Sequence, residues 1–490
     1  MQITSRPLMT ASKEAMMQRV EPILTTLQEA EKMAKHEQKD KKVGETVCGK
    51  HARKIKELFH NALSEVIWVS IDELYEDDWQ ESELGIPHKV AKLNVLTRGM
   101  LEYDNSYLSE SFAAKPEDYR PYFYSYIIQE DTSSYRVVYE RLREMKDKWF
   151  LASFSMKGFD RYHEYQGEIE SSASPVTYRR HNIYISDITL DQETLDEINL
   201  SYDVIAKPTP DGNIAKILTA LLQDVKFTRS RIYAVGNGNL IDIVGEKGGR
   251  PFDLIYDVGY HSRQHPHDNR SSYGAAIRSF QHVVPDAVLL SHWDDDHIMG
   301  CVYGRSELFD CLWIAPEIAK KRAISARRLA AYLTVNGKLV IAKREDTARR
   351  LARIVTLNST VSLYLGENKS KHTITKENCG GMVIEITTQL NGQAVESLFC
   401  GDVPYEAVNT VIWGVRSGGY DNLLVPHHGS AMEYSPLKVR KSAQAIVCGD
   451  GSSNRPHDNH RTALEANGTG YSVEVTGNKT APPWTELDLQ

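Results

Sequence analysis

The segment AVLLSHWDDDH (residues 287–297) decides how the C-terminal half of this sequence is interpreted. An apolar run from 287 to 290 stops at polar residues with the spacing His-x-Asp-x-Asp-His. In near-extended backbone, alternate side chains point to the same side, so His292, Asp294 and Asp296 can converge. Imidazole nitrogen and carboxylate oxygen both ligate divalent metals. The segment therefore predicts a metal site at a strand end, with a solvated polar loop as the alternative.

Two later segments end in the same way and favour the metal site. Gly401-Asp402 and Pro426-His427-His428-Gly429 each follow an apolar run. From residue 231 onward the chain contains a series of such short runs, each ending in polar residues or glycine. This pattern is typical of a sheet whose strand ends carry the residues of a functional site.

Taken in order, these segments resemble the metallo-β-lactamase fold, and more closely the soluble hydrolase domain of ComEC-type competence proteins. The segments that carry the resemblance are Val235-Gly236-Asn237-Gly238-Asn239, Asp257-Val258-Gly259, His292-x-Asp294-x-Asp296-His297, Gly401-Asp402, His427-His428-Gly429-Ser430 and Asn454-Arg455-Pro456-His457. The resemblance covers about residues 231–465 and implies an α/β fold, the αββα sandwich. It departs from the family at Asn237 and Asn239, where Gln and Asp are usual, and nothing in residues 1–230 resembles the membrane channel of competence proteins.

The resemblance implies a set of metal ligands. His292 and Asp294 would bind one metal, Asp296 and His297 would bind the other, and Asp402 would bridge both. The cofactor it implies is a pair of divalent metal ions. Such a pair, about 3.5–4 Å apart, makes hydroxide available at neutral pH.

Three more residues receive roles in the same way. One histidine of the 427–428 pair would complete the second metal site; His428 is the favoured ligand, and His427 would then support a ligand or contact the substrate. Asp257, at a strand end, would orient a ligand rather than bind metal, with a turn-capping role as the alternative.

The chemistry of the site follows from these ligands. Asp296 is a candidate catalytic residue because it can accept a proton as well as bind metal. His457 is a candidate for protonating the leaving group or holding a phosphate, with Asn454 and Arg455 beside it as substrate-binding residues; a plain loop histidine is the alternative. Asp294 stands where the metallo-β-lactamase fold usually has the second His of an HxHxDH motif, as in the ComEC-type proteins that the chain resembles. This carboxylate makes the site harder and shifts the expected metal from Zn²⁺ towards Mn²⁺, with Zn²⁺ still open.

A basic segment at about 315–355 is predicted to be a helical insertion in the hydrolase domain. Eleven Lys or Arg residues fall between positions 320 and 353. Four of them pair up seven residues apart and so share one side of a helix: Lys320, Lys321, Arg327 and Arg328. We interpret them as a substrate-binding surface for a polyanion, with a solvated helix face as the alternative.

Chain length and composition predict two domains. At 490 residues the chain exceeds what one hydrophobic core usually organises. The Pro- and Gly-containing segment 207–212 is the linker signal, and we place the boundary so that 1–228 is a mixed α+β accessory domain and 229–490 is the hydrolase. The elements expected near this boundary and before it are strands at 66–71, 148–154 and 181–190 and a helix at 213–226.

Charge, cysteines and hydropathy narrow the class of protein. Lys and Arg number 58 against 66 Asp and Glu, so the net charge of −8 argues against indiscriminate nucleic-acid binding. No apolar run reaches about 18 residues, and the six cysteines form no CxxC pair. We expect a cytoplasmic protein with reduced thiols and no membrane contact.

These observations lead to one functional hypothesis and two rivals. The leading hypothesis is a metal-dependent phosphodiesterase or nuclease, whose substrate is nucleic acid or another phosphodiester. The second keeps the hydrolase and changes the bond to a carboxylic ester, thioester or lactam. The third is a partner-binding protein with a vestigial site. In each case the N-terminal domain is open to a role in recognition, regulation or binding a protein partner.

Overall fold

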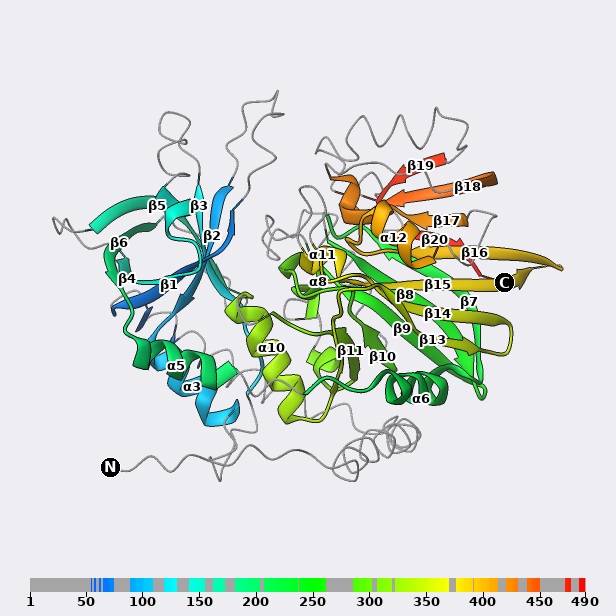
Figure 1. Cartoon of the computed structure of the whole chain (residues 1–490), viewed down its shortest axis with the longest axis horizontal. Helices are drawn as coiled ribbons and strands as arrows, with labels where there is room; N and C mark the ends of the chain where they lie inside the picture. The colour runs from blue at the N-terminus through cyan, green and yellow to red at the C-terminus, as the bar shows by residue number, and fades with distance from the viewer. Residues whose placement is uncertain are drawn as a thin grey trace.

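The structure is a computed structural model in which two units, a barrel and a two-sheet sandwich, lie side by side (Figure 1). The residues that it describes are 54, 57–58, 61–62, 65–74, 89–108, 119–129, 141–154, 162–171, 181–202, 207–236, 238–260, 285–301, 306–319, 322–369, 376–390, 392–412, 420–430, 439–449, 472–476 and 484–489.

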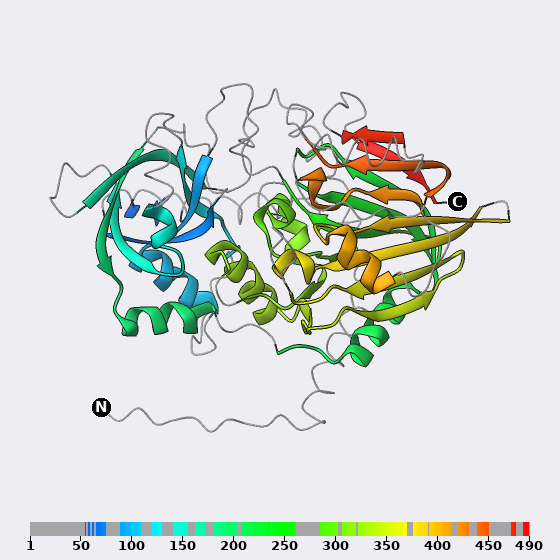
Figure 2. The same cartoon turned by 45° about the horizontal axis from the view of Figure 1, so that its top comes forward.

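The first unit is a closed antiparallel barrel with strand order β1-β2-β3-β5-β6-β4. Its strands are β1 (Ile67–Leu74), β2 (Lys89–Leu96), β3 (Tyr124–Gln129), β4 (Trp149–Phe154), β5 (Tyr162–Ser171) and β6 (His181–Thr189). The strands expected at 66–71, 148–154 and 181–190 correspond to β1, β4 and β6. Two helices, α3 (Arg98–Leu108) and α5 (Gln192–Tyr202), pack together beside the barrel (Figure 2).

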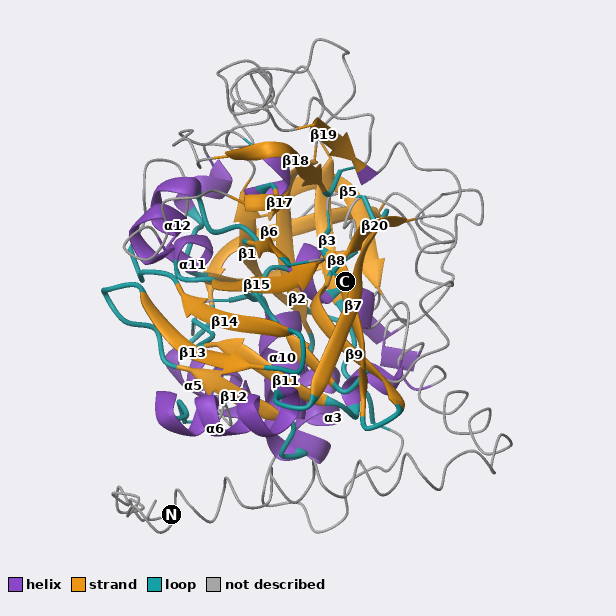
Figure 3. Ribbon diagram, turned by 90° about the vertical axis from the view of Figure 1, so that its right-hand side faces the viewer, coloured by secondary structure: helices purple, strands orange, loops and turns teal. Residues whose placement is uncertain are grey.

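The second unit is a sandwich of two seven-stranded sheets (Figure 3). The first sheet has the order β12 (Leu339–Ala342), β11 (Leu312–Pro316), β10 (Ala287–Leu289), β9 (Arg250–Val258), β8 (Leu240–Lys247), β7 (Val225–Tyr233) and β20 (Trp484–Asp488). The second has the order β13 (Arg349–Val355), β14 (Ser359–Leu365), β15 (Met382–Leu390), β16 (Gln393–Phe399), β17 (Tyr420–Leu424), β18 (Val439–Val447) and β19 (Ser472–Val475).

Helices cover the sandwich on its outer faces. α10 (Ile324–Val335) packs outside the first sheet, whereas α11 (Lys376–Cys379) and α12 (Tyr405–Ile412) share a core cluster with the outer face of the second. The apolar cluster between the sheets also takes in the apolar side chains of α6 (Asp211–Leu222). The predicted αββα layer order is confirmed.

Parallel strands set the position of the functional site. β9, β10, β11 and β12 run parallel to one another in the first sheet, and β16 to β19 do so in the second. Loops that follow such strands gather at the carboxyl ends, which is where open α/β sheets bind their ligands. The segments after β10, β16 and β17 carry the predicted ligands.

The domain boundary lies earlier than the sequence suggested. Residue 228 falls inside β7 (Val225–Tyr233), so the cut between 228 and 229 would split a strand of the sandwich. The helix expected at 213–226 ends at Leu222, and its buried residues join the core between the sheets. The sandwich unit therefore begins at Asp211, directly after the Pro-containing linker.

The predicted basic insertion is wrong. Residues 315–355 contain the end of β11, then α10, β12 and β13, which are integral parts of both sheets and their covering layer. Arg327 and Arg328 are 3% and 0% exposed, because α10 is covered by the first sheet on one side and by the barrel unit on the other. They are therefore not a surface for a polyanion; Lys320 and Lys321 lie outside the described residues.

Arg328 instead joins the two units. Its Nε donates to Asp104 Oδ2 at 2.8 Å and its Nη1 donates to the carbonyl oxygen of Tyr122 at 2.8 Å. The guanidinium also lies 3.9 Å from the centre of the Tyr122 ring. Asp104 accepts further hydrogen bonds from the hydroxyls of Tyr119 and Tyr202. A buried charge is tolerated here because every partner in this network is polar or aromatic.

None of the described helices is long and apolar enough to cross a membrane. Five cysteines lie in the described part of the chain; all five are buried and none of them forms a disulfide.

A buried carboxyl on β8 predicts a pH-dependent stability. Burial, and then the charge of Asp253, raise the pKa of Asp242 to about 8, although Arg231 opposes the shift. The folded state thus holds a proton that the unfolded chain releases near pH 4, so this contribution to stability is complete below about pH 4 and is lost as the pH rises through 8. At pH 9, the free energy of unfolding of Asp242→Asn is expected to exceed that of wild type by about 1 kcal/mol or more. Urea unfolding of both proteins measures this difference. If the difference in unfolding free energy between the variant and wild type is the same at pH 5 and pH 9, the prediction is wrong.

Candidate metal centre

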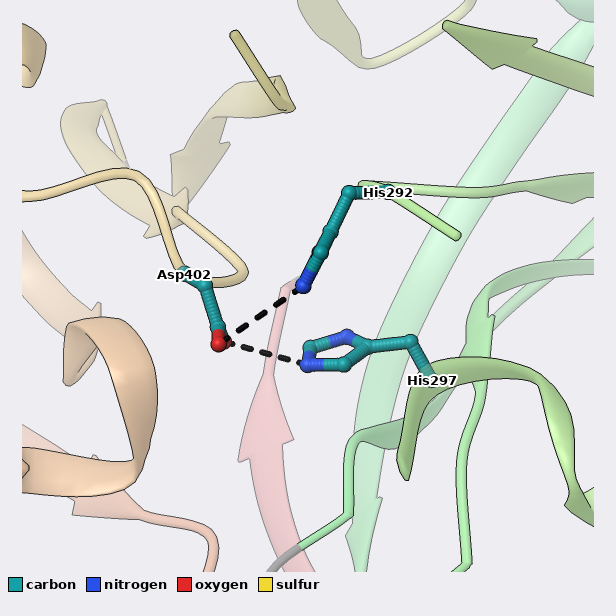
Figure 4. A group of neighbouring side chains, drawn as sticks. All are labelled: His292, His297 and Asp402. Atoms are coloured by element: carbon teal, nitrogen blue, oxygen red, sulfur yellow. Dashed lines mark ion pairs between the residues drawn. The ribbon is translucent and has the colours of Figure 1, made fainter. Parts of the chain in front are cut away.

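Three loops at the carboxyl edge bring histidines and carboxylates together. The loop after β10 supplies His292 and His297, the turn after β16 supplies Asp402, and the turn after β17 supplies His428. All four residues are at most 2% exposed. Figure 4 shows the Asp402 carboxylate facing the ring nitrogens of His292 and His297.

Asp402 is the centre of this group. Its Oδ1 lies 3.1 Å from His297 Nε2 and 3.6 Å from His428 Nε2, and its Oδ2 lies 3.7 Å from His292 Nε2. Asp296 extends the group on one side, with Oδ2 3.4 Å from His428 Nε2 and Oδ1 3.9 Å from His297 Nε2. The ligand atoms form two overlapping sets, His292–His297–Asp402 and Asp296–His297–His428, and within each set they lie within 4.8 Å of one another.

The far nitrogens of the three rings are held by hydrogen bonds. His297 Nδ1 lies 2.8 Å from Asp257 Oδ2, and His428 Nδ1 lies 3.2 Å from the carbonyl oxygen of Cys448. Ser291 Oγ donates to Asp257 at 2.7 Å, so its lone pairs are left to accept from His292 Nδ1 at 3.0 Å. With each Nδ1 protonated, each Nε2 presents a lone pair to the site, which is the tautomer that binds metal.

The strain in the backbone is concentrated here. Asp257, His427 and His428 adopt φ values of 59°, 50° and 55°, which non-glycine residues rarely do. Together with Asp147 they are all the non-glycine residues of the described chain with positive φ. Such conformations persist where the surroundings impose them, and they cluster at functional sites.

Glycines allow the loops to approach closely. A Cβ on Gly401, whose φ is 54°, would lie 2.5 Å from Ser291 Cβ, so only glycine lets the Asp402 turn meet the motif loop. A Cβ on Gly259 would lie 1.9 Å from the carbonyl oxygen of Asp296. That carbonyl also accepts from the backbone N–H of Asn239 at 3.2 Å. Asn239 and Gly259 therefore support the backbone of Asp296.

The geometry distinguishes His428 from His427. His428 Nε2 faces Asp402 and Asp296, whereas His427 places Nδ1 2.5 Å from Asp402 Oδ2. Asn378 lies beside this contact, with Nδ2 3.3 Å from Asp402 Oδ2. His427 and Asn378 thus hold Oδ2 of Asp402, the oxygen nearer His292, and leave Oδ1 facing His297 and His428. Asn378 was not predicted, because nothing in its local sequence marks it.

Asp294 lies at the edge of the site and is shared between two partners. Its Oδ2 is 3.3 Å from His292 Nε2, and its Oδ1 is 2.6 Å from Arg322 Nη2. Burial raises the pKa of Asp294, but the charges of Arg322 and His292 outweigh it and hold the pKa below its usual value. Arg322 thus compensates the charge of Asp294.

The unsatisfied atoms of the site fit divalent cations. Four buried atoms have no hydrogen-bond partner among the described residues: His292 Nε2, His297 Nε2, His428 Nε2 and Asp402 Oδ1. Burial lowers the pKa of His297, yet the charges of Asp402, Asp257 and Asp296 raise it well above its usual value. The cluster therefore attracts positive charge strongly. Nitrogen and carboxylate donors converging in a buried site satisfy what a divalent metal requires.

Several predicted site residues lie outside the described residues. These are Asn454, Arg455 and His457, together with Lys320 and Lys321. Their proposed substrate and acid roles stay predictions.

No protein-family model and no curated protein matches the chain. Three solved structures illustrate what it is similar to. YhfI from Bacillus subtilis, a metallo-β-lactamase fold protein, is 12% identical, with 54% of this chain and 100% of that chain covered and a TM-score of 0.28. Tm1679, a metal-dependent hydrolase of the β-lactamase superfamily, is 9% identical over 53% and 98% of the two chains, with a TM-score of 0.30. BJP-1, a subclass B3 metallo-β-lactamase of Bradyrhizobium japonicum, is 14% identical over 42% and 75%, with a TM-score of 0.23. At these values the assignment of the site rests on its own geometry.

Proposed function

We propose that this protein is a two-metal hydrolase that cleaves phosphodiesters, with nucleic acid as the leading substrate class. One observation carries the proposal: three buried imidazole Nε2 atoms converge on the carboxylate of Asp402 at the carboxyl edge of the sheets. Within the described part of the chain, no protein donor satisfies these nitrogens. A structural histidine cluster would pair its lone pairs with N–H or O–H groups, because buried polar atoms are normally hydrogen-bonded.

The residues divide into two overlapping metal positions. His292 and Asp294, 3.3 Å apart, would hold one cation, and Asp296, His297 and His428 would hold the other, with Asp402 shared. His297 belongs to both sets of converging ligand atoms, which is why the two positions adjoin. Counting Asp257 behind His297, four carboxylates enter the cluster and, among the described residues, only Asp294 is paired with an arginine, so the site carries a negative charge that favours divalent cations. When bound, such a pair supplies hydroxide at neutral pH and offsets charge that develops on a phosphoryl oxygen.

The chain's own residues fix the geometry that this chemistry needs. Asp257 and Ser291 hold the orientation of His297 and His292, and His427 holds Asp402. Asp296 is the ligand most open to solvent, with a side chain 31% exposed, so it faces the side from which substrate enters. Burial raises its pKa, but His297 and His428 lower it overall. A carboxylate of low pKa is a weak base, which favours metal binding as its main role.

Two arginines support an anionic substrate. Arg322, 21% exposed, reaches Asp294 from the rim of the site. Burial, and then the nearby charge of Arg322, lower the pKa of Arg344 to about 10. A bound phosphate would offset this positive charge, and guanidinium groups bind phosphate well.

The test strips the protein with a chelator and restores Mn²⁺ or Zn²⁺ separately. Substrates are single- and double-stranded DNA, RNA, bis-para-nitrophenyl phosphate and a chromogenic lactam. We expect phosphodiester cleavage, restored by Mn²⁺ at least as well as by Zn²⁺, because Asp294 adds a hard oxygen ligand. Lactam cleavage without phosphodiester cleavage would overturn the substrate class. Activity with Zn²⁺ alone would overturn the argument from ligand hardness, and no metal-dependent cleavage of any substrate would count against the hydrolase.

A further inference from the structure

A buried lysine of the barrel reaches the metal motif. Lys92, on β2, forms an ion pair through Nζ with Asp295 Oδ2. The side chains are only 3% and 9% exposed. The two residues lie 203 positions apart in the chain, so this contact exists only when the barrel is docked on the sandwich.

Asp295 occupies a sensitive position. It lies between Asp294 and Asp296, the two carboxylates of the motif, and begins α8 (Asp295–Ile298). Its carbonyl oxygen accepts from Met299 N at 2.8 Å, and Asp294 accepts from His297 N at 2.9 Å. A displacement of Asp295 would therefore move a ligand on either side of it and tilt the short helix that carries His297.

A second contact from the same strand holds the neighbouring segment. Asn94, two residues after Lys92 and on the same face of β2, accepts from the backbone N–H of Ile324 at 2.9 Å. Ile324 is the first residue of α10, and Arg322, two positions earlier, is the partner of Asp294. One barrel strand thus touches the metal motif directly and also fixes the segment that carries its arginine.

The packing around these contacts is continuous. A single apolar cluster runs from the barrel interior through α3, α5 and α10 to the outer face of the first sheet and includes Trp293 of the motif. The barrel is therefore joined to the sandwich by a core, whereas domains that move independently usually meet through smaller and more polar surfaces.

We infer that the barrel is built into the metal centre and that Lys92 is a positioning residue, which holds Asp294 and Asp296 in place by gripping Asp295. The inference rests on the proposed metal centre. It assigns a part of the N-terminal unit to the hydrolase itself. Partners that orient metal ligands typically contribute about 10- to 100-fold to metal affinity or activity.

The test compares two neutralised ion pairs across the same interface. The double variant Lys92→Met with Asp295→Asn removes the ion pair between barrel and metal motif without leaving a buried unpaired charge. Asp104→Asn with Arg328→Met neutralises the other barrel–sandwich pair, which makes no contact with the metal motif among the described residues. Mn²⁺ affinity is measured by competition with a fluorescent chelator, and the melting temperature of each metal-free protein is recorded alongside.

We expect the Lys92–Asp295 variant to bind Mn²⁺ about tenfold or more weakly, and the Asp104–Arg328 variant to stay within about threefold of wild type. Equal Mn²⁺ affinity in the two variants would overturn the role of Lys92, since a purely structural contact would affect melting alone. Should the first variant fail to fold, Lys92→Arg, which keeps the charge and reach, is expected to bind Mn²⁺ within about threefold of wild type; a tenfold loss would overturn the inference. Failure of wild type to bind Mn²⁺ would instead overturn the metal centre.

Discussion

Replacing Asp402 with Asn is expected to lower metal-dependent hydrolysis by more than about 100-fold. Residues that merely orient a ligand contribute 10- to 100-fold, and Asp402 faces all three imidazoles directly. The change removes the charge and keeps the size of the side chain, so the fold should persist. The measurements are turnover of bis-para-nitrophenyl phosphate and Mn²⁺ bound per chain.

The matched control for this variant is Glu246→Gln, which neutralises an exposed carboxylate on β8. It should retain wild-type turnover and metal content. Near-normal turnover in Asp402→Asn, with metal content unchanged, would remove Asp402 from the site.

Replacing Arg328 with Met is expected to cost about 3–5 kcal/mol of folding free energy. The guanidinium is fully buried, and its loss would leave the carboxylate of Asp104 buried without its cation. Restoring neutrality with Asp104→Asn should recover much of that loss, because the two hydrogen-bonding tyrosines keep their partner. Urea unfolding of the single and double variants measures both effects.

The matched comparison is Arg98→Met, which removes the exposed ion pair of Arg98 with Glu197 and should cost less than about 1 kcal/mol. If Arg328→Met lowered the folding free energy as little as Arg98→Met does, Arg328 would be a solvated side chain. The hypothesis of a basic surface on this helix would then be open again.

The residues of the candidate metal site could be picked out from the sequence because their signals are local. His292, Asp296 and Asp402 follow short apolar strands, and strand ends are recognisable from the sequence. The fold followed from the order of these segments. Lys92, Asn378 and Arg322 were not assigned to the site, since each becomes significant only through a partner elsewhere in the chain.

The basic segment shows how a correct local pattern can give a wrong conclusion. Arg327 and Arg328 do lie on a helix, as their spacing indicated. Their environment depends on Asp104 and Tyr202 in the other unit, which the local pattern cannot reveal. The boundary was misplaced for a related reason: polar residues alternate with buried ones through β7 from Val225, and this stretch was assigned partly to a helix.

Anomalous diffraction from crystals grown with Mn²⁺ tests the central claim most directly. The account predicts two peaks about 3.5–4 Å apart. One should lie among His292, Asp294 and Asp402, and the other among Asp296, His297, His428 and Asp402. Loss of both peaks in Asp402→Asn crystals would complete the assignment. Crystals of wild type that show no peak at these side chains, or a peak held by other residues, would contradict it.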